Sequence, residues 1–383
     1  MRAARPTAKT PWRRDLAGTL LAFALLLPFA ARAEDQAAGD WLSGDHATGE
    51  WGGRRSALED RGLALEADYT GETFTRDTSD IAYRGNLDLK LTVDTDKAGL
   101  WKGGQVLVYG QDGHGDQISA RPGFAMPVSN YEAANFTQLS EFWLYQELPG
   151  GIALRLGKQD ANTDFVAPRF AGNFMNSSFG VLPTTPMPSY PAPALGVAAF
   201  VDATSWLQLR GAVYEGDPKV ESFGKHAFDG DAGVFTIGAV DLHPGRNGPR
   251  DTIVQAGGWY HSADERSGAF AIADVLFRLA PAPGHEHRSM QAFVRTDWEP
   301  GADDANARLY VGGGATMHGF VGDNNTLGLG FGYVDQTDED QGFLELIFKW
   351  RRIEWMTIEP DFQLYFKDGD TYVIGGLRCK LKL

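Results

Sequence analysis

Acidic, basic and aromatic side chains recur at every second position along many stretches of the chain. This mixture suits weak binding of a polyhydroxylated molecule, because arginine presents a rigid fork of donors and carboxylates accept, so neighbouring hydroxyls can use both. Aromatic rings add flat faces for C–H surfaces. The candidates of this parity are Arg84, Arg155, Arg210, Arg295 and Arg378 among the bases, Glu66, Asp68, Asp88, Glu345 and Asp361 among the acids, and Trp143 and Tyr365 among the aromatics.

The same residues have a plainer interpretation. Charges at alternate positions can hydrate an interior wall and brace neighbouring strands by cross-strand pairing. For any single residue the sequence leaves both interpretations open. For the set as a whole, an arginine–carboxylate constriction that binds and releases its ligand is the preferred hypothesis.

Residues 342–383 show most clearly which element positions these side chains. Leu344 and Phe348 fall on one parity, whereas Glu345 and Lys349 fall on the other. Successive side chains of a β-strand point to opposite faces, so a period of two predicts strands. Because the polar face carries both signs of charge, we expect membrane strands with apolar residues toward lipid and ions toward a water-filled interior.

Alternating runs of this kind recur about sixteen times from Leu63 to the C-terminus, a number within the range of outer-membrane barrels. Trp350, Trp355 and Tyr372 sit near the ends of runs, where membrane strands place an aromatic girdle. Long connections tend to alternate with tight turns, which is typical of a barrel with a loop rim and a turn rim. The predicted fold is all-β: a transmembrane antiparallel β-barrel of about 16 strands with a short N-terminal helical segment.

The bulk composition fits this class. Of the 383 residues, 43% are hydrophobic and 22% are charged. These values exclude a helical membrane protein, whose spans each need about 20 consecutive apolar residues, but they allow a barrel, in which alternation dilutes the apolar residues. The single cysteine, Cys379, excludes an internal disulfide. It lies on the lipid parity, so we expect it to act as a small apolar residue.

The N-terminus is a predicted signal peptide, residues 1–33. Arg13 and Arg14 form a basic start, an apolar run too short to span a membrane follows, and residues 31–33 form an Ala-Arg-Ala cleavage site. Its removal leaves 29 basic and 49 acidic residues, a net charge of −20. An acidic exported chain of this kind excludes a nucleic-acid binder, whose surface would be basic.

Residues 34–62 differ from everything that follows, because they show no period of two. A short helix is expected over residues 56–61, ended by Gly62 in a left-handed conformation. We predict a periplasmic segment over residues 34–62 and the barrel over residues 63–383.

The longest predicted connection, residues 160–193, is rich in proline, which cannot donate to a strand ladder and stiffens the chain. A stiff loop of this length is usually functional or disordered. Two alternatives stay open for it: the loop folds inward and narrows the lumen, or it remains on the surface.

Enzymatic activity is the main alternative to transport. A secreted β-rich carbohydrate-active enzyme would also carry paired carboxylates and aromatics. However, carboxylates are spread through every strand, and the chain contains neither a Gly-x-Ser-x-Gly nor a His-Glu-x-x-His motif. His285 and His287 are expected in a solvated turn. We therefore expect no catalytic residue, metal site or cofactor.

Several short segments, in a specific order, resemble the carbohydrate-selective porin family (OprB-like). They are Gly49–Arg54, Leu58–Gly62 with the acidic strand that ends at Tyr69, Tyr83–Leu89 and on to Asp94, Gly103–Gly104, Leu154–Gln159 with Asp164 and Phe165, Ser189–Pro191, Pro360–Gln363 and Gly375–Arg378. The resemblance implies a sixteen-stranded outer-membrane barrel of a Gram-negative cell that admits sugars. It places Arg84, Arg155 and Glu66 first among the candidate sugar contacts, because they lie in family-like segments. The chain ends in Leu383, where outer-membrane strands usually end in an aromatic residue.

The resemblance also implies the partners of the chain: mono- or oligosaccharides, outer-membrane lipid and the barrel-assembly machinery, with no nucleic acid. Both a monomer and a homo-oligomer remain open. A general diffusion porin without sugar preference, or an adhesin, would use the same barrel. Block of the ion current by saccharide separates these alternatives.

Overall fold

The computed structural model describes residues 44–77, 80–119, 123–222, 230–244, 250–282, 285, 287–301, 307–322, 324–336 and 340–383. The predicted signal peptide and the first ten residues of the predicted periplasmic segment, 34–43, lie outside the described residues.

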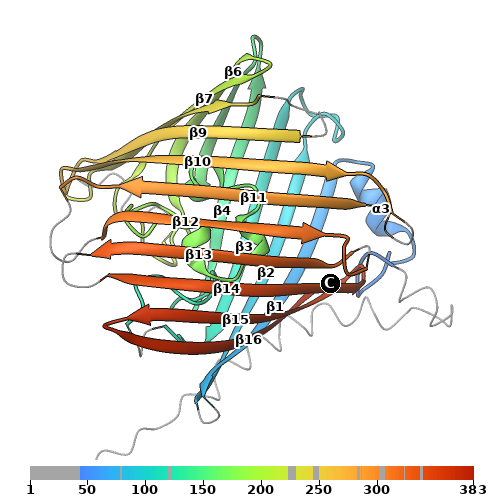
Figure 1. The fold of residues 1–383 in the computed structure, drawn as a ribbon. Helices are drawn as coiled ribbons and strands as arrows, with labels where there is room; N and C mark the ends of the chain where they lie inside the picture. Colours follow the sequence, from blue (N-terminus) through green and yellow to red (C-terminus); the bar gives the residue numbers. More distant parts are fainter. Residues whose placement is uncertain are drawn as a thin grey trace, which may run out of the picture.

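Sixteen antiparallel strands form one closed barrel, in which each strand pairs with its neighbours in the sequence and β1 pairs with β16 (Figure 1). The predicted fold class is therefore confirmed. The strands are β1 (Leu63–Asp77), β2 (Asp80–Asp94), β3 (Gly104–Gly115), β4 (Phe136–Leu148), β5 (Ile152–Gln159), β6 (Ala194–Thr204), β7 (Leu207–Glu215), β8 (Val234–Leu242), β9 (Arg250–His261), β10 (Arg266–Leu279), β11 (Arg288–Trp298), β12 (Ala307–His318), β13 (Thr326–Gln336), β14 (Gln341–Ile353), β15 (Met356–Lys367) and β16 (Asp370–Lys382).

Helices are few and short. They are α3 (Arg54–Glu59), α4 (Ala161–Phe165) and the two 3₁₀ turns η1 (Ala171–Asn173) and η2 (Ser177–Phe179). Among the described residues, no helix is both long and apolar enough to cross a membrane.

Burial alternates along the strands as the period of two predicts. In β13, Leu329 is 59% exposed and Phe331 is 43% exposed, whereas the intervening Gly330 is buried. Leu344 and Leu346 of β14 are exposed on the same outer face, and Glu345 between them is fully buried. The outer face is therefore apolar, and the polar parity points into the barrel.

Two of the three predicted girdle aromatics lie elsewhere. Trp350 is 43% exposed on the outer face, but Trp355 is only 7% exposed in the turn between β14 and β15. Tyr372 shares the parity of the buried Ile374, and its ring meets Phe124 edge-on at a centroid distance of 5.4 Å. The prediction was wrong for these two residues because strand register, and not nearness to a strand end, decides which face a side chain takes.

The two rims of the barrel differ. The three longest connections, residues 116–135, 160–193 and 216–233, all leave the same rim, which we call the loop rim. The opposite turn rim carries the C-terminus and α3 (Figure 1). Short links such as 149–151 and 205–206 close this rim, although residues 243–249 and 280–287 make longer ones.

Arg55 attaches the N-terminal segment to the turn rim. Its guanidinium donates to the carbonyl oxygens of Leu65 at 3.1 Å and Leu383 at 3.0 Å, and it lies 4.1 Å from the ring centroid of Trp51. Gly62, with φ 80°, then turns the chain into β1, as expected for a left-handed residue. One buried cation therefore joins the start of the described chain to its last residue.

Replacing Arg55 with Ala should loosen this segment while leaving the barrel closed. Removing hydrogen bonds to a buried charge costs about 1.5–3 kcal/mol. Limited proteolysis of the folded protein should then cut within residues 44–62 faster than in the wild type. The matched control is Arg54→Ala, since Arg54 is exposed; equal cleavage rates in the two variants would contradict this role of Arg55.

Candidate functional site: the barrel interior

The loop of residues 160–193 folds into the barrel. Its backbone is held by interior carboxylates: Glu345 accepts from the Met175 N–H at 2.6 Å, and Asp274 accepts from the Arg169 N–H at 3.3 Å. Gly172 of the loop accepts from Lys349 Nζ at 2.8 Å. Because these partners lie on the inward faces of β10 and β14, the inward alternative is the one that the structure adopts.

The loop of residues 116–135 also lies inside and packs against the first. Tyr365 Oη donates to the Met126 carbonyl at 2.9 Å, and Gln363 Nε2 donates to the Val128 carbonyl at 3.0 Å. The two loops meet directly where the Asn130 N–H donates to the Met175 carbonyl at 2.8 Å. Their backbone groups are thus satisfied by the wall and by each other, as buried backbone requires.

One apolar cluster packs both loops against β11–β16, and a second packs Phe165, Val166 and Leu182 of the long loop against β6–β10. Phe174 and Phe179 of the long loop pack on Phe293 of β11, with centroid distances of 5.8 and 5.5 Å. The wall makes room with glycine: a Cβ at Gly330 would lie 2.6 Å from the Phe179 ring. The interior along β11–β15 is therefore a packed core, where the sequence had suggested ions around the whole circumference.

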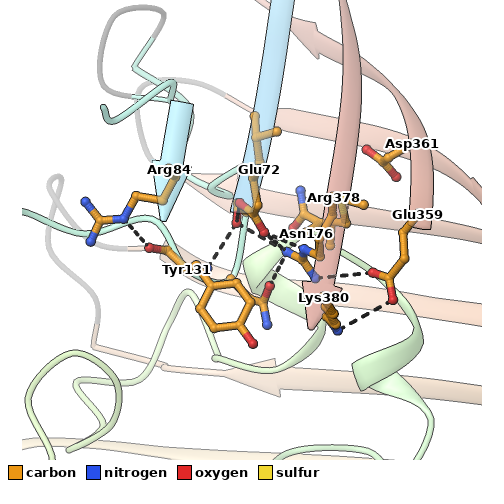
Figure 2. A network of polar contacts seen from close by, with 12 residues as sticks. Glu72, Arg84, Tyr131, Asn176, Glu359, Asp361, Arg378 and Lys380 are labelled. Atoms are coloured by element: carbon orange, nitrogen blue, oxygen red, sulfur yellow. Dashed lines mark hydrogen bonds and ion pairs between the residues drawn. The ribbon is translucent and has the colours of Figure 1, made fainter. Parts of the chain in front are cut away.

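A charged network crosses the seam between the first and last strands (Figure 2). Arg378 of β16 donates to Glu72 of β1, its direct cross-strand partner. The guanidinium also lies 3.8 Å from Glu359, which Lys380 approaches at 3.6 Å. All these groups except Lys380 are at most 1% exposed. Such buried charges are tolerated when each is paired.

Arg84 connects this region to the shorter inward loop. Its Nε donates to the Tyr131 carbonyl at 2.9 Å (Figure 2), and its Nη1 donates to Asn135 Oδ1 at 3.1 Å. The residue is 3% exposed. Arg378 adds a bond from Nη2 to Asn130 Oδ1 at 2.6 Å. Both arginines therefore hold residues 130–135 against the wall.

The opposite side of the barrel keeps more solvent exposure. The side chains of Arg155 (β5) and Arg210 (β7) are 11% and 16% exposed and converge on Asp164 of the long loop: Arg155 pairs with its carboxylate, and Arg210 donates to its carbonyl. Arg210 also pairs with Asp241 at 2.5 Å. The Arg155 guanidinium lies 5.2 Å from the ring centroid of Trp143. Cations, carboxylates and an aromatic face thus occupy one accessible patch.

Asp160 holds the start of the long loop in its turn. Its carboxylate accepts from the Asn162 N–H at 2.6 Å, from Ser189 Oγ at 3.1 Å and from the Tyr190 N–H at 3.3 Å. Burial raises the pKa of the Asp160 carboxyl, and it raises the pKa of the Tyr190 hydroxyl to about 12. The two ends of the loop are therefore joined through one buried carboxyl.

Comparison with known proteins assigns the fold to a family. Residues 78–283, more than half of the chain, match the family model described as carbohydrate-selective porin, OprB family. The chain belongs to this family.

Solved structures agree with this assignment at the level of the fold. The high-pH structure of Pseudomonas putida OprB aligns with a TM-score of 0.74 and 16% identity, covering 89% of this chain and 99% of that one. The low-pH structure aligns with a TM-score of 0.63 at the same identity and coverage. An anion-selective porin from Comamonas acidovorans aligns at 0.52 with 10% identity, covering 84% and 99% of the chains. No curated protein sequence matches the chain.

The chain is therefore an outer-membrane porin for carbohydrates, and its family and fold are those of a channel rather than an enzyme. Within the described ranges, no group of three or more His, Cys, Asp and Glu residues is placed to hold a metal ion. His285 is described, but the neighbouring Glu286 lies outside the described residues.

The structure divides the predicted lumen residues of the porin into two sets. The packed side contains buried residues that bind the loops or the wall: Arg84, Arg295, Arg378, Glu345, Asp361 and Tyr365. The accessible side contains Glu66, Asp68, Trp143, Arg155 and Arg210, which are exposed or half-buried. Asp88 is 8% exposed and accepts from Asn86, Tyr109 and Gln111.

Within these sets only some residues meet. Glu345 and Tyr365 come together around Asn176, whose N–H donates to Glu345 at 3.1 Å and whose side chain donates to Tyr365 at 2.5 Å. Arg155 and Arg210 meet at Asp164. Arg295 stands apart and donates to the Gly180 carbonyl at 3.0 Å.

The sequence does not identify three acidic partners of the arginines: Asp164 of the long loop, and the strand residues Asp241 and Glu72. Asp164 was visible only as part of a family-like segment, and Asp241 and Glu72 followed the inward parity but were not singled out as site residues. The period of two identifies the face of a strand residue, but it cannot show which loop atom will lie opposite that residue.

Replacing Glu345 with Ala should release the middle of the long loop. Two buried backbone N–H groups would lose their acceptor, at about 1–3 kcal/mol each. Single-channel recordings should show a larger and noisier conductance than the wild type. Glu66→Ala is the control, because Glu66 is exposed and faces inward from β1; a Glu345→Ala channel as quiet and narrow as this control would exclude the anchoring role.

Proposed function

We propose that sugars cross the porin past the inward-facing side chains of β4, β5 and β7 around Arg155, beside the inward loops. The observation that carries this proposal is the patch at Arg155. Its guanidinium lies between Asp164 of the long loop and the rings of Trp143, at 5.2 Å, and Phe200, at 5.8 Å. Strand and loop together bring a donor, an acceptor and aromatic faces to one place.

The patch has the chemistry that a sugar needs. Guanidinium groups donate and carboxylates accept, so two adjacent hydroxyls can replace part of an existing ion pair. Ring faces contact the C–H surfaces. Because Arg155, Asp164 and Arg210 remain half-buried and paired with each other, a sugar must compete with these pairs. Binding is then weak enough for release, as conduction requires.

The other predicted residues receive different roles in this proposal. Glu66 and Asp68 lie near the start of β1 and would line the mouth at the turn rim. The loop-binding residues Arg84, Arg295, Arg378, Glu345 and Tyr365 would shape the pore by holding the loops. Asp88 and Asp361 would brace the wall, since Asp361 accepts from Gln363 at 2.8 Å.

We further propose the route by which the porin reaches the membrane. Residues 1–33 direct export from the cytoplasm of a Gram-negative cell and are removed, residues 34–62 stay in the periplasm at the turn rim, and the barrel-assembly machinery inserts residues 63–383. A signal-like start with a basic residue pair and a small-residue cleavage site supports export.

The test is block of ion current by sugar in a planar bilayer. Arg155→Ala should raise the half-blocking concentration of a mono- or disaccharide roughly 5- to 30-fold, equivalent to about 1–2 kcal/mol of lost hydrogen bonding. The control Arg61→Ala removes an exposed arginine outside the strands. Unchanged block in Arg155→Ala would remove this residue from the site. A wild-type channel that no saccharide blocks would instead favour a general diffusion porin.

A further inference from the structure

A groove of about 700 Å³ lies on the outer face of the barrel, between the N-terminal segment around α3 and the wall of β1–β4. We call it the outer groove. Most of its strand residues belong to the outward parity, and Leu65, Leu89 and Val108 among them are 39–41% exposed; Glu66 and Lys90, of the inward parity, also border it. The outer groove is therefore separate from the lumen, and transport of sugar does not use it.

One row of cross-strand neighbours forms the floor of the outer groove. Ala67 pairs with Leu89, Leu89 with Gly110, and Gly110 with Leu139, while the Leu383 N–H donates to the Ala67 carbonyl at 2.7 Å. Four inter-strand steps of about 4.8 Å make the row roughly 19 Å long. Its floor is aliphatic throughout, so it offers an extended apolar path.

The row rises through the membrane from the turn rim. Leu383 is the last residue of the chain at that rim, whereas Leu139 lies nearer to the loop-rim end of β4 at Phe136 than to its other end at Leu148. Strands of such barrels tilt by about 35–45°, so a row that crosses them climbs as it goes round. One end of the outer groove is thus at the membrane surface, and the other is in the hydrocarbon.

A rigid aromatic and a cation stand at the surface end. Trp51 lines the outer groove, donates from Nε1 to Thr48 Oγ1 at 3.2 Å and is stacked by Arg55 at 4.1 Å. Arg54 also lines the groove and is exposed. Over the part of the chain that the structure describes, the Arg54 guanidinium has no hydrogen-bond or ion-pair partner.

We propose that the outer groove binds one glycerophospholipid of the membrane leaflet at the turn rim. One acyl chain lies along the row from Ala67 to Leu139, and the phosphate pairs with Arg54. An arginine fork matches a phosphate, and interfacial tryptophan is common at headgroup level. The volume falls within the roughly 300–1,000 Å³ of ordinary ligand pockets, so the groove holds one bound molecule and is not just a flat wall.

The experiment uses the full-length porin in vesicles of phosphatidylethanolamine and phosphatidylglycerol, with a small fraction of phosphatidylglycerol that carries a diazirine near the end of one acyl chain. After illumination, mass spectrometry locates the labelled residues. Labelling of Leu89, Val108 and Leu139 should exceed that of Leu329 and Leu344 on the far wall several-fold. Even labelling of both walls would overturn the proposal, because it would mean ordinary annular lipid only.

A pair of glycine variants tests whether the groove itself holds the chain. Gly110→Leu should fill the floor and abolish the excess labelling, since a Cβ there meets only the Gln138 carbonyl, at 3.8 Å. The matched control is Gly211→Leu on the outer face of β7, where a Cβ meets only the Ile237 carbonyl, at 3.9 Å. Equal labelling of the two variants, or a cross-link from the groove to a second copy of the chain, would overturn the proposal.

Arg54→Gln tests the headgroup contact. With this variant, labelling of the groove by the phosphatidylglycerol probe should fall several-fold, while labelling by a diacylglycerol probe with the same acyl chain should not change. An equal response of the two probes would overturn the assignment of the phosphate to Arg54. Sugar block of the current should remain at the wild-type level in all three variants, because none of the three positions faces the lumen.

Discussion

The pairing of β1 with β16 is the interaction on which the rest of the structure depends. A sheet in a bilayer has no water to satisfy its edges, so every backbone donor and acceptor must find a partner in another strand. Closing the barrel removes both edges at once. Glu72 and Arg378 are direct cross-strand partners at this seam, and Arg55 ties the N-terminal segment to the Leu383 carbonyl beside it. The seam thus brings together the two ends of the described chain.

A closed barrel of this size would leave a wide interior, and the two inward loops reduce it by packing against the wall. They can do so only because their polar backbone is satisfied there: Glu345 and Gln363 bind loop N–H and C=O groups, and phenylalanines of the loop pack over wall glycines. The same carboxylates and arginines that a membrane barrel tolerates on its inner face thereby become the supports of the loops. Selectivity for sugars then depends on the patch where Arg155, Asp164 and Trp143 meet.

The outer face of the barrel contacts lipid instead of loops or water. Its side chains meet hydrocarbon, and most of it is a plain aliphatic wall. The outer groove departs from this plainness, because the segment of residues 48–58 adds a roof that carries Trp51 and, within the described residues, the guanidinium of Arg54 without a partner. A short polar helix at the turn rim can therefore create a lipid-binding groove on the outer face without crossing the membrane.

The alternation of apolar and polar residues predicts the barrel. It predicts about sixteen runs from Leu63 onward, and the first strand, β1, begins at Leu63. This worked because lipid on one side and polar groups on the other impose a strict period of two on every strand. The same period set the inward face of each predicted lumen residue. It did not place Tyr372 and Trp355, because register is a property of pairs of strands.

The role of each inward residue follows from the packing of the loops inside the barrel. Arg84, Arg295 and Glu345 look like Arg155 and Glu66 in the sequence, yet the first three are buried against loops and the other two remain accessible. The difference comes from the path of residues 116–135 and 160–193, which follows from contacts between residues more than one hundred positions apart, such as Met175 with Glu345. No local pattern encodes such contacts, because the loop and the wall become neighbours only after the barrel has closed.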